Sequence, residues 1–169
     1  MKDFDLVHFY PTEEIFEKAK AIFESEKTHL KELIPEADIQ QVGSSAIPGA
    51  LGKFDIDIQI RISGELFKSV EVIMQQYYQE KHKERLWNED LMVFLSKEEN
   101  SEKIDYMVTV IDSPYDDYYR VRDYFINNPE ALADYNAFKM HYEGKPYHEY
   151  RTAKGAYLGG NGSVRFLDY

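Results

Sequence analysis

Apolar residues follow two different spacings along the chain, and each spacing predicts a different kind of element. Between positions 12 and 34 they recur near helical spacing, which predicts an amphipathic helix capped by Thr12 and ended by Pro35. Over positions 54–62 they alternate strictly with polar residues. That alternation predicts a strand with one buried isoleucine face and one open polar face.

The segments around this strand complete the expected order of elements. ADIQQVGSS (37–45) predicts a short strand running into a turn of small residues, and the SSAIPGALGK run carries the proline and glycines of a loop. Strands are expected over 91–96 and 103–111, joined by the polar hairpin KEENS. Further helices are expected over 64–79, 114–127, 129–142 and 147–158, with Pro129 at the first position of the third.

This order predicts an α+β fold, in which a mixed or antiparallel β-sheet is flanked by helices and followed by a helical C-terminal part. We expect a single domain over 1–169, with the sheet-containing core in 1–112 and the helical segment in 113–160. The tail GGNGSVRFLDY is expected to be loose or packed as an extended segment.

Charge and composition narrow the classes of partner. The formal net charge of −11 argues against a nucleic-acid backbone as the main partner, because such binding needs clustered lysine and arginine. It is compatible with an anionic substrate, because a bound divalent cation can reverse the local field. The absence of cysteine excludes disulfides, thiolate catalysis and Cys-based zinc sites.

Neither a signal peptide nor a membrane span is expected. The N-terminal run MKDFDLVHFYP is acidic and has no apolar core, and no window approaches about 18 consecutive apolar residues. We therefore expect a soluble, cytoplasmic protein. No Ser-His-Asp grouping is identifiable, and no metal-ligand spacing appears among the histidines, which are His8, His29, His82, His141 and His148.

The candidate chemistry centres on Gly43-Ser44 and on the Asp55-Ile56-Asp57 segment. Ten residues separate Ser44 from Asp55. Two aspartates at i and i+2 of a strand point to the same face about 7 Å apart, and such carboxylates can share one or two Mg²⁺ ions. A triphosphate must approach the backbone closely, which Gly43 permits, and Ser44 offers a hydroxyl and an amide to a phosphate oxygen.

A plainer interpretation of the two aspartates is the solvated face of an edge strand, which is the commoner origin of an isolated Asp-x-Asp. The Gly-Ser turn at this distance favours instead a metal-capable site, or the remnant of one.

The run of a hydrophobic residue, Gly-Ser, a short spacer and Asp-hydrophobic-Asp resembles the pattern of the DNA polymerase beta-like nucleotidyltransferase superfamily. VGSSAIPGALGK followed by DI is similar to the motif of one branch, the GrpB family. The later runs VRDYFINNPEALADYNAFK and HEYRTAKGAYL also resemble segments of that family, so that the resemblance covers roughly residues 38–158. In the GrpB motif Asp57 takes the place of the main aspartate. Asp55 stands where that family usually has an apolar residue and the superfamily has an aspartate.

The resemblance implies a nucleotidyltransferase-like fold and a set of site residues. The superfamily's third carboxylate lies on a later strand between hydrophobic residues, where Asp105 is the best match, although the GrpB family tends to have histidine near this strand and this chain has none there. A Mg²⁺ or Mn²⁺ ion would be held by Asp55, Asp57 and Asp105. The implied nucleotide- and phosphate-binding residues are Gly43, Ser44, Ser45, Lys53, Lys139 and Lys154. As surface lysines the last three need no special explanation.

The implied reaction is nucleotidyl transfer. An acceptor hydroxyl attacks the α-phosphate of a nucleoside triphosphate, pyrophosphate leaves, and Asp105 acts as general base or as a further metal ligand. The expected acceptor is an unidentified small molecule or protein side chain, and a nucleic acid is not expected. The alternative is a non-catalytic module of the GrpB family that binds a nucleotide or another phosphorylated ligand. Turnover of labelled triphosphates separates the two.

Overall fold

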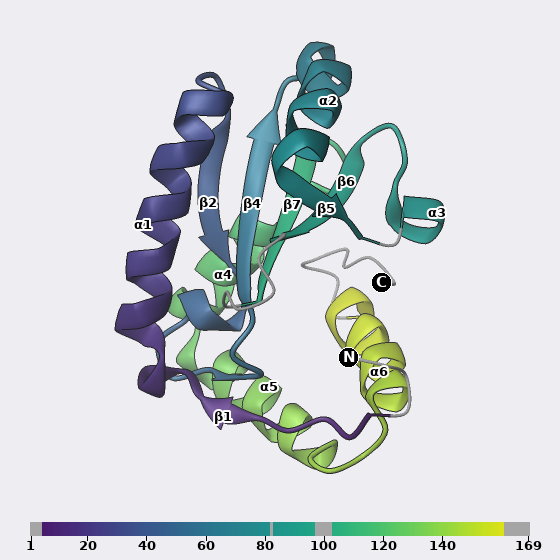
Figure 1. Ribbon diagram of the computed structural model, residues 1–169. Coiled ribbons are helices and arrows are strands. Elements are labelled where there is room, and N and C mark those ends of the chain that lie inside the picture. The colour runs from purple at the N-terminus through teal and green to yellow at the C-terminus, as the bar shows by residue number, and fades with distance from the viewer. Residues whose placement is uncertain (1–4, 82, 97–102, 161–169) are drawn as a thin grey trace.

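The computed structural model describes residues 5–81, 83–96 and 103–160, and a five-stranded sheet lies at its centre (Figure 1). β4 and β7 run parallel, whereas every other neighbouring pair of strands is antiparallel, so the sheet is mixed. In spatial order the strands are β2 (Asp38–Val42), β4 (Ile56–Ile62), β7 (Ile104–Val110), β6 (Leu91–Ser96) and β5 (Tyr78–Glu80). A separate two-stranded ladder joins β1 (Tyr10–Pro11) to β3 (Leu51–Gly52).

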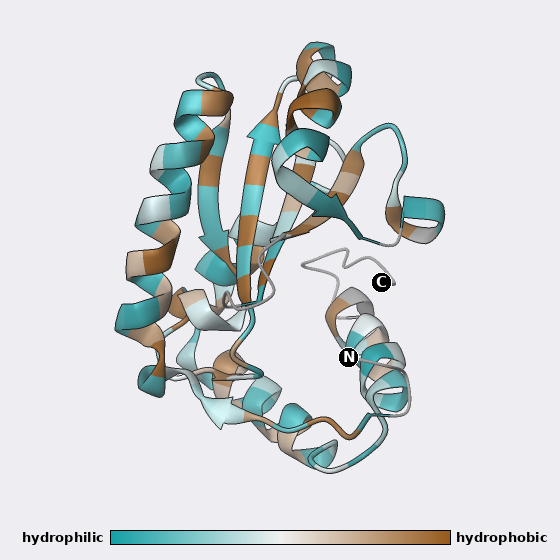
Figure 2. Cartoon of the chain, in the orientation of Figure 1, coloured by the Kyte–Doolittle hydropathy of each residue, from teal (hydrophilic) through white to brown (hydrophobic). Residues whose placement is uncertain are grey.

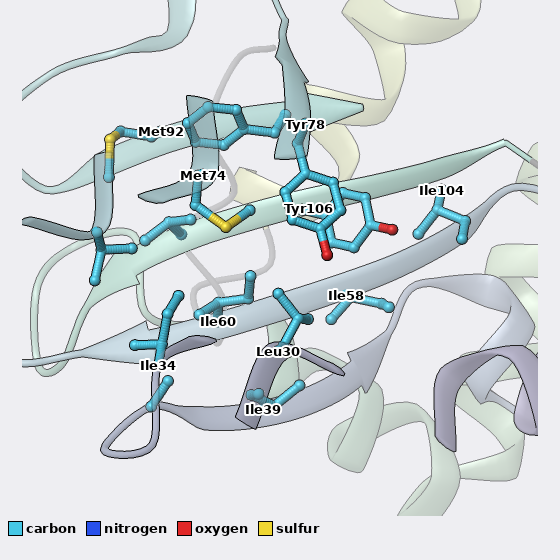
Figure 3. Packing of buried hydrophobic residues seen from close by; sticks show 14 of the residues in the cluster. Leu30, Ile34, Ile39, Ile58, Ile60, Met74, Tyr78, Met92, Ile104 and Tyr106 are labelled. Carbon is cyan, nitrogen blue, oxygen red and sulfur yellow. The ribbon is translucent and has the colours of Figure 1, made fainter. Parts of the chain in front are cut away.

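The main hydrophobic core lies between one face of this sheet and the helices α1 (Phe16–Leu33) and α2 (Phe67–Tyr77). Hydropathy alternates along β4 (Figure 2), and its isoleucines all point into this core. Figure 3 shows Ile58 and Ile60 of β4 facing Leu30 of α1, with Met74 of α2 and Tyr106 of β7 completing the layer. Full burial of one such aliphatic side chain contributes about 1.5–3 kcal/mol. The alternation therefore fixes which face of β4 is turned to the core.

The opposite face of β4 is not open, and that part of the strand prediction is wrong. The helix α4 (Tyr118–Asn127) packs against this face, where Gln59 is fully buried. The Gln59 side chain donates to the hydroxyl of Thr109 and accepts a hydrogen bond from the backbone of Tyr119. Polar residues alternate here because a hydrogen-bonded layer lies beneath α4. Periodicity alone cannot distinguish such a layer from a solvated face.

The C-terminal part is helical, with α5 (Pro129–His141) and α6 (Tyr147–Gly160) following α4. Pro129 begins α5, as predicted. A second cluster of buried residues joins these helices to the loop after β2. Its members are Ile47, Ala50, Val121, Phe125, Leu132, Tyr135 and Leu158. The helical part is therefore fixed by apolar contacts to the loop that follows Gly43-Ser44.

Several local predictions need correction. Thr12 does not cap α1: it is buried, and its hydroxyl donates to the carbonyl of Ala50. The segment predicted as one helix over 64–79 is a short 3-10 turn (Gly64–Leu66) followed by α2 and the edge strand β5, and the four-residue helix α3 (Lys83–Leu86) was not foreseen. Short 3-10 turns also span Thr12–Glu14 and Ser44–Ala46.

The KEENS connection and residues 161–169 of the tail lie outside the described residues, although β6 and β7 do pair as neighbouring antiparallel strands. Across the described part of the chain, every helix is too short or too polar to cross a membrane.

Candidate functional site

Three strand ends bring the predicted site together. β2 ends at Val42, while β4 and β7 begin beside it, at the lower end of the sheet in Figure 1. The register pairs Val42 with Asp57, and Asp57 in turn with Asp105 of the parallel neighbour. The two aspartates therefore lie side by side on one sheet face, and the chain leaves β2 directly into Gly43.

The carboxylate of Asp57 is the centre of this arrangement. It forms no hydrogen bond or ion pair with any other residue in the described ranges. Burial raises its pKa to about 6, and the negative charges of Asp105 and Asp55 act in the same direction. Lys154 and Lys53 partly offset this increase. An unbonded carboxylate next to two others is unfavourable for the protein alone, which is typical of a ligand-binding group.

This arrangement predicts that Asp57→Asn stabilises the protein at neutral pH. The pKa of about 6 in the folded state lies above the ordinary value of 3.8. Ionised Asp57 therefore costs stability above pH 6, and the cost disappears as the pH falls toward 4. Urea unfolding at pH 7.5 should show a gain of up to about 3 kcal/mol for Asp57→Asn, fading to nothing near pH 4. The exposed α5 variant Asp134→Asn is the control and should show no such pH-dependent gain. A stability difference that does not vary with pH would contradict the account.

Asp105 has a different environment. Nζ of Lys81 lies 2.5 Å from its Oδ2, whereas its Oδ1 is buried and has no hydrogen-bond partner in the described structure. One oxygen of this carboxylate is thus neutralised by a lysine and the other is left for a ligand. Lys81 follows the unforeseen strand β5, so no feature of the sequence indicated this pair.

Asp55 is paired with two lysines. It precedes β4, and its carboxylate contacts Lys53 at 2.9 Å and Lys103 at 3.0 Å. Burial alone would raise the pKa of Asp55, but the two lysines outweigh it and hold the pKa below its usual value. Burial alone would lower the pKa of Lys53. The charge of Asp55 outweighs burial, so the pKa of Lys53 lies above its usual value. Because β4 and β7 are parallel and in register, Lys103 stands beside Asp55 just as Asp105 stands beside Asp57. The sequence pattern shows this only once the register is known.

The turn after β2 forms the other wall of the site. Gly43 has φ of 72°, and a Cβ built on it would lie 2.0 Å from Oδ2 of Asp57. Only glycine therefore fits between β2 and this carboxylate. The next two residues begin a 3-10 turn, and the buried Oγ of Ser45 has no hydrogen-bond partner among the described atoms. A role of Ser45 in phosphate binding stays a prediction.

Lys139 of α5 forms hydrogen bonds with this turn and with the loop that follows it. Its side chain is 1% exposed, and its Nζ donates to Oγ of Ser44 at 3.0 Å and to the carbonyl of Leu51 at 2.5 Å. Burial, together with the nearby Lys154 and Lys53, lowers the pKa of Lys139 well below its usual value. A role in phosphate binding remains a prediction, and any such role would act through Ser44. Lys154 of α6 is exposed and close enough to Asp57 to influence its pKa.

The donor set fits one divalent ion better than the predicted three-carboxylate cluster. No group of three His, Asp or Glu side chains in the described ranges is close enough together to hold a metal. Of these three carboxylates, Asp57 and Oδ1 of Asp105 have no partner among the described residues, whereas lysines engage Asp55. Mg²⁺ is usually held by one or two carboxylates together with substrate phosphates and water. The pair Asp57 and Asp105 meets that description, and the role of Asp55 as a ligand stays a prediction.

This mixed sheet, with its glycine turn and carboxylates at one end, defines a nucleotidyltransferase-like fold. The Cid1 poly(U) polymerase structure superposes with a TM-score of 0.52 at 12% identity, over 89% of this chain and 44% of that one. The chain thus spans less than half of Cid1, and the likeness shows the fold alone.

The family follows from the sequence itself. The profile of the GrpB protein family matches residues 13–160, and the chain belongs to that family. The UPF0157 protein VC_A0354 of Vibrio cholerae is 27% identical over 155 residues, which cover 91% of this chain and 81% of that protein. The crystal structure of the conserved protein GrpB from Enterococcus faecalis superposes with a TM-score of 0.61 at 18% identity, over 73% of this chain and 76% of that one. The predicted resemblance and fold class are confirmed.

Proposed function

We propose that this protein is a metal-dependent nucleotidyltransferase that moves a nucleoside monophosphate from a nucleoside triphosphate to a small-molecule or protein acceptor. The observation that carries the proposal is the carboxylate of Asp57, which has no hydrogen-bond or ion-pair partner within the described ranges and lies beside Asp105 and against the glycine turn at Gly43. A structural carboxylate would be expected to have found a protein partner.

The charges around the site support an anionic substrate. The chain as a whole has a net charge of −11, yet lysines gather around these three aspartates. They come from separate elements of the fold and are Lys53, Lys81, Lys103, Lys139 and Lys154. Such a local concentration of positive charge in an acidic protein attracts a polyanion to one place on the surface.

The chain's own residues can be assigned to the steps of the transfer. A Mg²⁺ or Mn²⁺ ion bound by Asp57 and Asp105 would supply positive charge to the phosphates and the leaving pyrophosphate. The hydroxyl of Ser45 and the turn at Gly43 would bind phosphate oxygens. As the acceptor hydroxyl forms its bond to the α-phosphorus, the bond to the pyrophosphate oxygen breaks, and Asp105 or Asp57 takes the hydroxyl proton.

The structural relative points to the donor class and not to the acceptor. Cid1 is a poly(U) polymerase, and because a polymerase of this kind joins nucleotides, the likeness supports a nucleoside triphosphate as the donor here. The acidic charge of the chain disfavours an RNA acceptor, which would need a cationic path along the surface. Because the proposed donor is an intracellular metabolite, the proposal places the protein in the cytoplasm.

Isothermal titration calorimetry of ATP, GTP, CTP and UTP with Mg²⁺ tests the proposal. Wild type should bind one triphosphate only when Mg²⁺ is present, and Asp57→Asn should weaken that binding about 100-fold or more, because a charged ligand to the ion is lost. Asp134→Asn removes the same charge from the exposed surface of α5 and should bind as wild type does.

The outcomes separate the two functions that the site can serve. Metal-dependent binding followed by release of pyrophosphate with an acceptor panel supports the transferase. Tight binding without turnover supports a nucleotide-binding module. No binding of any triphosphate, with or without Mg²⁺, would rule out both.

A further inference from the structure

Lys81 contacts Asp105 in a way that the proposed function does not use. It follows directly after the edge strand β5, and its ammonium lies 2.5 Å from Oδ2 of Asp105. The two side chains are only 21% and 12% exposed. The backbone N–H of Lys81 donates to the carbonyl of Val93 at 2.9 Å, which continues the β5–β6 ladder. The backbone that carries this ammonium is therefore anchored on the sheet.

The same carboxylate is one of the two that fit the divalent ion. The two oxygens of Asp105 differ: Oδ2 pairs with Lys81, whereas Oδ1 is buried without a partner in the described structure. A divalent ion at Oδ1 and an ammonium at Oδ2 place two cations, with three positive charges between them, on one carboxylate. At such short separation, in poorly hydrated surroundings, their repulsion is much stronger than in water. The ion and the ammonium therefore oppose each other at this residue.

We propose that Lys81 is an internal counter-cation that competes with Mg²⁺ or Mn²⁺ for Asp105 and keeps the ion affinity of the ligand-free site low. The inference rests on the proposed function, because it takes Asp57 and Asp105 as the carboxylates that hold the ion. A triphosphate adds negative oxygens that attract both the ion and the lysine, so the ion and the triphosphate bind cooperatively. The site would thus be filled by the metal–triphosphate complex in preference to the free ion.

The other lysines do not take this position in the described structure. Lys53 and Lys103 pair with Asp55, and Lys139 donates to the turn at Ser44. Lys83, two residues after Lys81, pairs with Glu80 and Glu71 at the surface. Lys83 therefore provides a matched control that changes the same charge on the same segment.

Binding of Mn²⁺ to the full chain without nucleotide, followed by the electron paramagnetic resonance signal of free Mn²⁺, tests the inference. Lys81→Gln keeps a hydrogen-bond donor for Oδ2 but removes the charge, and should bind Mn²⁺ about ten-fold tighter than wild type. Lys81→Arg and Lys83→Gln should stay within about two-fold of wild type. Thermal unfolding confirms that each variant is folded.

A further variant shows whether the effect acts through Asp105. In the Asp105→Asn background, Lys81→Gln should no longer tighten Mn²⁺ binding, and a gain that persists there would overturn the inference. Equal Mn²⁺ affinity of wild type and Lys81→Gln would also overturn it, while leaving the proposed function standing. Mn²⁺ binding by none of the variants, even with a triphosphate present, would overturn both together.

Discussion

Replacing Gly43 by alanine is expected to weaken metal-dependent triphosphate binding by on the order of 100-fold. The added Cβ would lie 2.0 Å from Oδ2 and 2.7 Å from Cγ of Asp57, closer than real Cβ atoms approach such atoms. The carboxylate, the turn or both must move, and a displacement of about 1 Å at a reacting centre costs on the order of 100-fold. Calorimetry with Mg²⁺ and the preferred triphosphate would measure the loss.

Gly144 offers a control that separates backbone strain from the clash. It has φ of 71°, almost the same as the 72° of Gly43, but a Cβ added there meets nothing within 4 Å. Both alanine variants should lose about 1–3 kcal/mol of stability from the positive φ, and Gly43→Ala should lose more because its Cβ also meets Asp57. Only Gly43→Ala should lose binding. If the two variants bind the triphosphate equally well, Asp57 does not lie at the centre of the site.

The parts of the site that could be predicted from sequence are those set by neighbouring residues. The alternation through β4 places Asp57 opposite the isoleucine face, and the Gly-Ser turn stands at a suitable distance before it. Both follow from local rules about strands and glycine. Short apolar runs also predicted the strands β6 and β7, since both segments are buried on both faces of the sheet.

The partners of these residues could not be predicted, because they depend on strand order and register. β7 lies parallel beside β4, and this pairing places Asp105 next to Asp57 and Lys103 next to Asp55. The pairing of Asp105 with Lys81 needed the edge strand β5, which sequence periodicity merged into a helix. A local pattern thus identifies which residues are polar, whereas the tertiary fold decides which charges are neutralised.

The same limit applies to the polar face of β4, and it leads to the largest expected effect on stability. Asp116 is fully buried and accepts hydrogen bonds from Nε and Nη2 of Arg61 at 2.6 and 2.7 Å, from Gln59 at 3.1 Å and from the backbone of Asp112 at 2.9 Å. Arg61 also donates to Asp38 of β2 at 2.6 Å and stacks on Tyr119 of α4. The network thereby fastens α4 to two strands of the sheet.

Asp116→Ala is expected to destabilise the protein by about 3–5 kcal/mol, because it leaves the donors of Arg61 and Gln59 unpaired in a buried layer. Urea unfolding measures the change.

Asp117→Ala, the matched control, removes a surface pair with Arg120 and should cost about 0–1 kcal/mol. The double variant Arg61→Met/Asp116→Leu should lose less than the sum of its single variants, since no unpaired charge of this pair remains. If Asp116→Ala and Asp117→Ala cost the same, the network does not hold α4 on the sheet, and the face beside Asp57 is set by apolar packing alone.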